Sequence, residues 1–496
     1  MTHPTSSGQR QLVVIGAGAA GLYTAICAAR ESAHVTLVSA TELAESSSYW
    51  AQGGLAAALA AQDSPEKHLA DTLAAGRDLV RASAARALTL EAAHAIEDLE
   101  ELGVSFDADR SGRLALGLEG GHSVRRIVHA GGASTGRRIV RQLSAIVAAD
   151  DRIDVLESRR AIGLLTFDGR CTGAVLDGDE VLHAPATALA TGGAAALWSR
   201  TTNPLGATGG GLLLAYAAGA ALADIELMQF HPTAVVAAGP QDGMLVTEAI
   251  RGEGACLLND RTERFVDELA PRDEVARAIY IELARSGADA VALDMRNVDL
   301  ALFPNVVSAL RGAGFDPEHS PIPVAPAAHY MMGGIATDLQ AHSSVPGLLA
   351  IGECACTGLH GANRLASNSL TECFVFGARA ARAALDEPAL LPAEIADSDR
   401  TLSRRAAQSN PGPPALSVSS RQALWKLAGL ERNGESLRRL QSDPHPLVQL
   451  IASAALVREE SRGAHWRSDF PSRNPELDFQ HVTLRAGQKS IFERWA

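Results

Sequence analysis

The glycine-rich turn GAGAAG at residues 16–21 is the feature that most constrains what this chain can fold into. It follows a short apolar run, QLVVI at residues 11–15, and it precedes LYTAICAAR, whose composition and spacing favour a helix. A second apolar run, HVTLVS, occupies residues 34–39. This order of strand, glycine turn, helix and strand predicts the first unit of a Rossmann-like domain that binds a dinucleotide.

Each glycine of the turn has a separate task in such a motif. Gly16 permits the tight turn, Gly18 admits the pyrophosphate, and Gly21 lets the helix pack on the strand. The N-terminus of the helix then faces the phosphates. The candidate cofactor-binding residues here are Gly16, Ala17, Gly18, Ala19 and Gly21.

The second strand ends differently from most dinucleotide-binding motifs. The position that usually holds Asp or Glu, which binds the ribose hydroxyls, is Ser39. A hydroxyl binds ribose less strongly than a carboxylate does. Ser39 therefore remains a candidate cofactor-binding residue, but a weaker one.

Composition excludes several classes of protein. The 44 Lys and Arg residues against 57 Asp and Glu give a net charge of −13, which disfavours binding to the phosphates of nucleic acids. The longest apolar runs are too short or too broken by glycine to span a bilayer, and the polar N-terminal segment lacks the apolar core of a signal peptide. We therefore expect a soluble, cytoplasmic protein.

The six cysteines are scattered along the chain, so we expect no metal site and no disulfide framework.

The length of 496 residues predicts more than one domain. Strand-like pieces separated by Asp-Gly turns between residues 152 and 193 indicate a small antiparallel sheet inserted in the nucleotide-binding domain. The change in composition after residue 225 indicates a capping domain, and leucine-arginine patterns beyond residue 400 indicate a helical bundle. The expected boundaries are 1–224 and 331–398 for the nucleotide-binding domain, 225–330 for the capping domain and 399–496 for the helical domain.

The stretch GLHGANRLASNSL, residues 358–370, places Arg364 among small residues. Small residues let a ligand approach closely, and a guanidinium in such a place suits a planar anion held by two hydrogen bonds. The alternative is an arginine that caps a helix or pairs with a surface acid. The stretch alone leaves both open.

Motifs along nearly the whole chain resemble the flavoproteins of the succinate dehydrogenase and fumarate reductase superfamily, and within it most closely the L-aspartate oxidase family. In order, they are GAGAAG, SSSYWAQGGLA, LEGGHSVRRIVHAGG, ATGG, TTNP, QFHPTA, TEAIRGEGA, APRDEVARAI, PAAHYMMGGI, GLHGANRLASNSL and ESRGAHWRSDFP. The resemblance implies an α/β fold: a Rossmann-like FAD-binding domain, with an inserted α+β capping domain and a C-terminal helical bundle.

The resemblance also implies a site for a four-carbon dicarboxylate. Arg364 and His329 would bind one carboxylate, and His231 and Thr247 would bind the other, with Gln229 beside them. Burying a dianion requires donors at both of its ends, which agrees with this assignment. Taken singly, each histidine would instead be interpreted as a buried core residue. Glu248 and Arg251 either orient these residues or form an ordinary structural salt bridge.

Two further residues are candidates for catalysis. Arg272 matches the family's catalytic arginine, which transfers a proton at the substrate carbon beside the one that faces the flavin. Arginine is a poor proton shuttle at its usual pKa, so in this role Arg272 needs neighbouring acids and a dry site. The alternative to a catalytic role is a structural one, in which Arg272 lies at a helix N-terminus and pairs with Asp273 or Glu274. Glu119 offers a carboxylate to a substrate ammonium group, unless it is a loop acid in solvent.

For the cofactor, the resemblance implies FAD. The residues expected along the flavin are Ser46, Ser47, Ser48, Ala51, Gln52, Gly53 and Gly54, with Glu353 near the ribityl chain and Ser369 and Leu370 at the ring edge. Respiratory relatives attach the flavin to a histidine at the position of Ser47, and a hydroxyl cannot form that bond, so we expect noncovalent FAD. Relatives often have Gly-Asp-Gly where this chain has glycine at 209–211, so a contact made by that aspartate is missing.

The expected activity is FAD-dependent oxidation of L-aspartate to iminoaspartate, the first step of NAD biosynthesis. The electron acceptor would be O2, which gives H2O2, or fumarate, and quinolinate synthase would consume the imine. The alternatives are a flavoprotein subunit of fumarate reductase or succinate dehydrogenase, and a noncatalytic flavin-binding protein. A noncatalytic protein has little reason to keep both carboxylate-binding ends together with Arg272.

Overall fold

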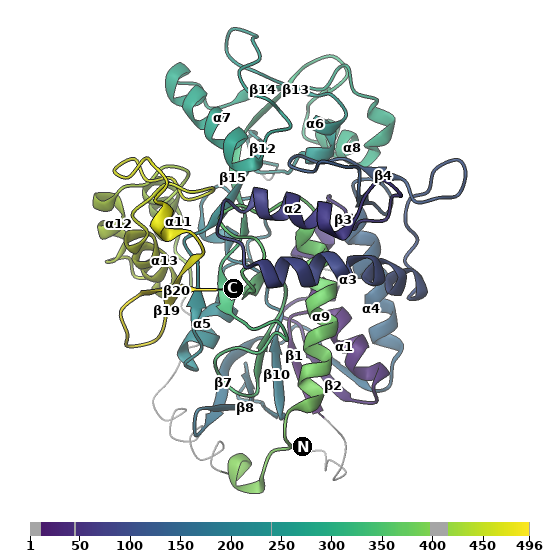
Figure 1. Ribbon diagram of the computed structural model, residues 1–496, viewed down its shortest axis with the longest axis vertical. Helices are drawn as coiled ribbons and strands as arrows, with labels where there is room; N and C mark the ends of the chain where they lie inside the picture. The colour runs from purple at the N-terminus through teal and green to yellow at the C-terminus, as the bar shows by residue number, and fades with distance from the viewer. Residues whose placement is uncertain (1–10, 44–45, 240, 397–414, 496) are drawn as a thin grey trace.

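The computed structural model describes residues 11–43, 46–239, 241–396 and 415–495. The polar segment in which we expect no signal peptide lies outside these residues, apart from its last position. Figure 1 shows a larger α/β part in the lower half of the view, a smaller part above it, and a group of C-terminal helices at its left side.

A five-stranded parallel sheet lies at the centre of the larger part and confirms the Rossmann-like fold class. Every neighbouring pair in it runs parallel. Its strands, in spatial order, are β17 (Leu348–Ala350), β10 (Ala186–Leu189), β1 (Gln11–Ile15), β2 (His34–Val38) and β6 (Ile153–Leu156).

Both faces of this sheet are covered, because alternate residues of β1 point to opposite sides. Leu12 and Val14 pack in a core with several helices, whereas Val13 and Ile15 pack in a second core with a small antiparallel sheet. The strands of this sheet are β7 (Ala161–Phe167), β8 (Arg170–Leu176) and β9 (Val181–His183). Burial on both faces explains why β1 is apolar without interruption. The helices include α1 (Ala19–Arg30), α3 (Ala82–Glu101), α4 (Thr135–Ala149) and α9 (Asn368–Asp386).

The glycine turn after β1 is packed tightly against the end of β10. Gly16 has a φ of +113°, and a Cβ there would lie 2.2 Å from the carbonyl oxygen of Ala190. A Cβ on Gly21 would lie 1.8 Å from the carbonyl oxygen of Gly16. Neither position accepts a side chain, which is the reason the motif could be predicted from its glycines.

The smaller part, which we call the cap, comprises the elements from β12 to β15 and has a hydrophobic core of its own. Its antiparallel sheet has the order β12 (Met228–Val235), β15 (Ile322–Met331), β14 (Val291–Asp294) and β13 (Cys256–Leu258). Its helices are α6 (Glu248–Gly252), α7 (Arg272–Ser286) and α8 (Pro304–Gly312). The remainder of the described chain up to residue 396 is called the body.

The C-terminal region contains helices, as the sequence predicts, but it ends in a β-hairpin that the sequence analysis does not foresee. The helices are α11 (Val418–Leu427), α12 (Gly434–Leu440) and α13 (Pro446–Val457). The hairpin strands are β19 (Gln480–Leu484) and β20 (Ile491–Arg494). β19 pairs with β11 (Leu222–Ala223), so the end of the chain completes a sheet at the junction of body and cap. Val482 and Leu484 are buried in the core, and the intervening His481 and Thr483 are buried as well, so both faces of β19 are covered.

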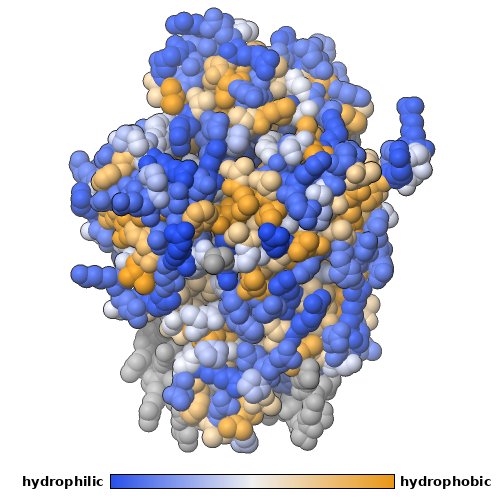
Figure 2. All heavy atoms as spheres, viewed as in Figure 1, coloured by the Kyte–Doolittle hydropathy of each residue, from blue (hydrophilic) through white to orange (hydrophobic). Residues whose placement is uncertain are grey.

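The other elements connect these parts. Figure 2 shows hydrophilic residues over much of one face, with apolar residues gathered near its centre. None of the helices in the described part of the chain is long and apolar enough to cross a membrane. The remaining elements are η1 (Ser47–Trp50), β3 (Leu55–Ala56), α2 (Pro65–Ala75), β4 (Leu116–Gly117), β5 (Ile127–Val128), η2 (Ala195–Leu197), α5 (Gly210–Ala217), η3 (Leu300–Leu302), β16 (Gly334–Ala336), η4 (Gly352–Cys354), β18 (Ala355–Cys356) and η5 (Pro475–Leu477).

Candidate active site

The structure brings the expected substrate-binding residues together from both parts of the molecule. The cap supplies Gln229 and His231 from β12, His329 from β15, Thr247 at the N-cap of α6, and Arg272 as the first residue of α7. The body supplies Arg364, from the loop before α9, and Glu119. All except His329 have side chains in the buried class, and His329 is half-buried.

The two histidines lie side by side because β12 and β15 are paired strands. Their ring centroids are 5.0 Å apart. Burial lowers the pKa of both well below the usual value, and the positive charge of Arg272 lowers it further. Nδ1 of His231 accepts from the backbone N–H of Thr233 at 3.3 Å, so the neutral ring carries its hydrogen on Nε2. His231 can therefore donate to a carboxylate without being charged.

Arg364 is buried, which rules out the alternative of a pair with a surface acid. Its Nη1 donates to Ser369 Oγ at 2.8 Å, and its guanidinium lies over the ring of Tyr330 at 4.5 Å from the centroid. Burial, together with the nearby charge of Arg272, lowers its pKa to about 10. Its Nε is buried without a hydrogen-bond partner. A buried cationic donor without a partner is costly, and a ligand carboxylate would remove that cost.

Arg272 does not pair with the acids next to it in sequence. Its Nε donates to Glu248 Oε2 at 2.5 Å, and its Nη1 donates to Gln229 Oε1 at 3.2 Å. Asp273 and Glu274 instead bind Arg77. The alternative of a helix N-terminal pair is therefore wrong, and Arg272 is directed into the site.

A second arginine lies on the other side of Glu248. Arg251 Nη2 is 3.4 Å from Glu248 Oε1, and both side chains are fully buried. Burial alone would raise the pKa of Glu248, but the charges of Arg272 and Arg251 hold it below the usual value. The three residues form a buried chain of alternating charge, which can pass a proton toward Arg272.

Glu119 is buried and is not a loop acid in solvent. Its Oε2 accepts from Ser367 Oγ at 2.7 Å, and its Oε1 lies 3.9 Å from His129 Nε2. Ser367 also accepts from the backbone N–H of Gly54, at 3.2 Å. Glu119 is thus held beside the segment expected along the flavin.

The residues expected to hold FAD lie along the carboxyl edge of the parallel sheet, and they fit a large polar ligand. Ser48 Oγ accepts from the backbone N–H of Ala19 at the start of α1, at 3.1 Å. Oε1 of Gln52 and the hydroxyl of Thr191 are buried without hydrogen-bond partners, which leaves acceptors and donors for a ligand. Burial raises the pKa of Glu353 to about 7, and its Oε1 accepts from the backbone N–H of Met331 at 3.0 Å.

The other expected cofactor residues occupy the same region. Ser46 Oγ accepts from the backbone N–H of Tyr49 at 3.3 Å and caps η1, which begins at Ser47. Ser39 is buried at the end of β2. Leu370 lies in the first turn of α9, but Ser369 binds Arg364 and so borders the substrate residues. Gly210 begins α5 with no side chain to offer a contact.

Three residues of the site were not predicted from the sequence. Tyr330 lies beneath Arg364, and its position next to His329 in PAAHYMMGGI was the available signal. Thr202 Oγ1 lies 2.8 Å from His329 Nδ1, and it occurs in the quoted TTNP. Ser367 gave no signal, because its role depends on a positive φ of 62° that turns its hydroxyl toward Glu119.

Comparison with known proteins shows the family to which the chain is similar. The model of the FAD binding domain family matches residues 11–370, and that of the fumarate reductase flavoprotein C-terminal family matches residues 435–492. The chain is 44% identical to the L-aspartate oxidase of Xylella fastidiosa over 95% of this chain and 94% of that protein. It is 40% identical to the L-aspartate oxidase of Mycobacterium leprae over 96% and 95% of the two chains.

Solved structures share the fold. FrdA of E. coli quinol fumarate reductase has a TM-score of 0.86 at 28% identity, covering 98% of this chain and 96% of its own. Sdh1 of Mycobacterium smegmatis in the apo form has a TM-score of 0.82 at 30% identity, covering 98% and 95%. The resemblance seen in the motifs therefore extends over the whole chain.

Proposed function

This chain belongs to the L-aspartate oxidase family, and from that premise we propose that it oxidises L-aspartate to iminoaspartate with FAD as its cofactor. The observation that carries the proposal is the pair of buried donor sets: Arg364, with an Nε that lacks a partner, in the body, and His231 with Thr247 in the cap. A four-carbon dicarboxylate presents one anionic group to each set. Buried donors at both ends offset the hydration that the dianion loses.

The protein residues divide the work of binding. Arg364 and His329 hold one carboxylate, and the stacking of Arg364 on Tyr330 fixes the plane of the guanidinium. His231 donates to the other carboxylate from Nε2, and its neutral state avoids a further buried charge beside Arg272. Burial of these side chains limits the access of water, which strengthens each of these interactions.

Arg272 transfers the proton when fumarate is the acceptor. Reduction of fumarate needs a proton at one of the two alkene carbons, and Arg272 is a buried donor whose charge acts on His231 at one end of the site and on Arg364 at the other. Glu248 and Arg251 then return a proton to Arg272. This arrangement supplies the neighbouring acid and the dry site that an arginine requires in order to act as an acid.

Glu119 supports an amino-acid substrate over a plain dicarboxylate. Its buried carboxylate lies beside the expected flavin-binding segment and can accept from the substrate ammonium group. The same charge would repel succinate or fumarate, which have no ammonium group. This residue and Ser47 favour L-aspartate oxidase over the alternative of a respiratory fumarate reductase subunit.

When bound, FAD accepts the two electrons that leave the substrate together with its Cα hydrogen. The glycine turn, residues 46–54, Glu353 and the N-terminus of α9 would hold it, and the hydroxyl of Ser47 leaves it noncovalent. Acid precipitation of the yellow protein should then leave all flavin in the supernatant, and flavin in the washed pellet would contradict the assignment.

The remaining parts of the proposal concern the setting of the reaction. The electrons pass on to O2, giving H2O2, or to fumarate, and quinolinate synthase consumes the imine in a cytoplasmic pathway.

We propose that the FAD-binding domain comprises residues 1–224 and 331–398, the capping domain residues 225–330, and the C-terminal helical domain residues 399–496.

Steady-state turnover of L-aspartate with O2 or fumarate as acceptor, and of succinate with O2 or a dye as acceptor, tests the proposed substrate. Faster turnover of succinate would favour the respiratory alternative.

A further inference from the structure

Arg77, two residues after the end of α2, joins the body to the cap through an ion pair. Its Nε and Nη2 donate to the two oxygens of Asp273 at 3.1 and 3.0 Å, and Nη2 also donates to Glu274 at 2.5 Å. Both acids lie in the first turn of α7, and the Asp273 side chain is 5% exposed. A bidentate pair fixes orientation as well as distance. The contact therefore fixes the start of α7 relative to the body.

The start of α7 is the part of the cap that carries Arg272. The partners of Arg272, Glu248 and Gln229, belong to the cap as well. Each also contacts the body through uncharged donors or acceptors: Glu248 Oε1 accepts from the backbone N–H of Gly120 at 3.0 Å, and Gln229 Nε2 donates to the carbonyl oxygen of Arg364 at 2.9 Å. Arg364 and Glu119 belong to the body. A substrate held by Arg364 meets Arg272 in the right place only if α7 is correctly placed over the body. The Arg77 contact lies one residue away from Arg272.

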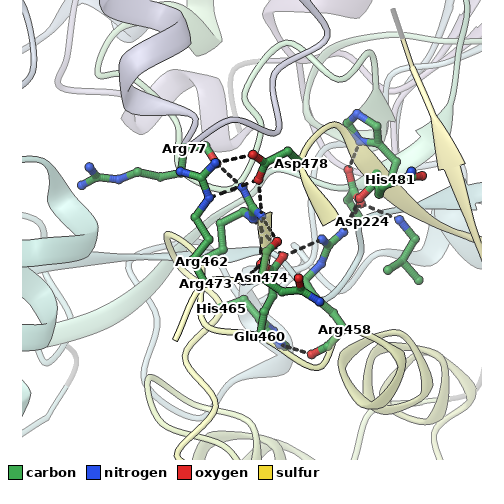
Figure 3. Close-up of polar contacts among 12 residues, drawn as sticks. Arg77, Asp224, Arg458, Glu460, Arg462, His465, Arg473, Asn474, Asp478 and His481 are labelled. Atoms are coloured by element: carbon green, nitrogen blue, oxygen red, sulfur yellow. Dashed lines mark hydrogen bonds and ion pairs between the residues drawn. The ribbon is translucent and has the colours of Figure 1, made fainter. Parts of the chain in front are cut away.

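The turn that presents Arg77 is itself held firmly. Arg77 and Asp78 both have a φ of +58°, which is uncommon for residues other than glycine. The carbonyl oxygen of Arg77 accepts from Nη1 of Arg462 at 2.7 Å. Arg462 is fully buried, and it also binds Glu460 at 2.8 and 2.9 Å and Asp478 at 2.8 Å. Figure 3 shows Arg462 between these acids and the backbone of Arg77.

The same C-terminal segment contacts α7 one turn further along. Arg277 Nη2 donates to the carbonyl oxygen of Gly463 at 3.1 Å, and its guanidinium lies over the ring of Trp466 at 5.1 Å. Tyr280 meets the same ring edge to face at 5.9 Å. These contacts hold the middle of α7. The ion pair of Arg77 lies at the end that carries Arg272, and it binds the residue that directly follows Arg272 in the helix.

We propose that Arg77 is a positioning residue of the reaction, which through Asp273 places Arg272 over the substrate bound to Arg364. The proposal rests on the proposed role of Arg272 and deepens it. Loss of the contact should slow proton transfer to fumarate more than it weakens binding. The carboxylate-binding residues do not touch Arg77, so the KM should change little.

The test compares Arg77→Gln, Asp273→Asn and the double variant in the FAD-loaded protein. Arg296→Gln is a matched control, because it removes a bidentate pair with Asp294, at 2.9 and 2.7 Å, that lies wholly within the cap. We expect kcat for fumarate reduction to fall about tenfold or more in each of the first three variants. The double variant should lose no more than Arg77→Gln alone, since that change already removes the contact with Asp273. Arg77→Lys, which keeps the charge, should recover part of the loss.

A second measurement tests the positioning role of Arg77 independently of which substrate the protein oxidises. Hydrogen exchange at the amides of residues 273–279 should be faster in Arg77→Gln and Asp273→Asn than in the native protein and Arg296→Gln. Unchanged hydrogen exchange and unchanged kcat in Arg77→Gln would overturn the positioning role. A double variant whose fold-loss in kcat equals the product of the two single fold-losses would overturn it as well. A native protein inactive on L-aspartate would overturn the substrate alone, because the exchange result does not depend on it.

Discussion

Arg272 and Glu248 form an ion pair of 2.5 Å between Nε and Oε2, with both side chains buried in the cap. The pair gives Arg272 a neighbouring carboxylate that an arginine needs in order to release and regain a proton. Because Arg251 lies on the far side of Glu248, the carboxylate serves as the link between two cations.

Replacement of Glu248 by Gln should break this link while keeping the size of the side chain. We expect fumarate reduction to slow by roughly 100-fold or more, the range by which general acid catalysis contributes. The variant should also be less stable, because loss of one partner leaves a buried charge without compensation, at a cost of about 3–5 kcal/mol. Turnover and urea unfolding of the FAD-loaded protein check both effects; near-native turnover would remove Glu248 from the proton path.

Replacement of Arg364 by Leu should remove one end of the dicarboxylate site. A desolvated charge pair of this kind is worth about 2–5 kcal/mol, so kcat/KM for L-aspartate and for fumarate should both fall by roughly 30-fold or more. Arg379→Leu is the control. Arg379 also lies on α9 but far from the site, and its Nε donates to Glu91 Oε2 at 3.0 Å. Equal kinetics of the two variants would show that Arg364 does not bind substrate.

Replacement of Glu119 by Gln should separate the two substrates. Loss of a charged partner for the ammonium group costs about 1.5–3 kcal/mol, so kcat/KM for L-aspartate should fall about tenfold or more. Fumarate reduction should be unchanged or faster, because a negative charge near a dianion is gone. Equal losses for both substrates would mean that Glu119 supports steps common to both.

Stability should fall as the pH drops below about 6.5, the ordinary pKa of histidine. Burial lowers the pKa of His231, His329 and His465 well below the ordinary value and that of His68 to about 3. The unfolded chain therefore binds protons that the folded protein does not, and each histidine removes up to about 1.4 kcal/mol of stability per pH unit below 6.5.

Glu353 acts in the opposite direction, since burial raises its pKa to about 7 and protonation then favours the folded state. Burial also raises the pKa of Glu226, but two such carboxyl groups do not outweigh four histidines. Urea unfolding at pH 7 and pH 5 gives the difference directly. Equal or greater stability at pH 5 would show that these histidines are charged in the folded protein.

The sequence predicts the glycine-rich turn but not the ion-pair partner of Arg272. Gly16 and Gly21 reveal the nucleotide-binding turn because no side chain fits there, whatever the rest of the chain does. The partner of Arg272 could not be predicted, because Asp273 is adjacent in sequence whereas Glu248 reaches it only through the packing of α6 and α7.

The C-terminal hairpin illustrates the same limit. Residues 480–484, QHVTL, have the alternation of a strand, but their partner β11 lies more than 250 residues earlier in the chain. Periodicity shows that a segment can form a strand and does not show where it pairs. The family resemblance supplied the residues of the site, and the structure supplied their contacts.

The central claim is that L-aspartate itself is the electron donor, and anaerobic mixing of the purified yellow protein with L-aspartate tests it most directly. Without O2 or another acceptor, the electrons of the substrate stay on the protein. L-Aspartate should therefore bleach the flavin absorbance completely, and succinate at the same concentration should bleach it slowly or not at all. An absorbance that L-aspartate leaves unchanged, or that succinate bleaches faster, would contradict the account.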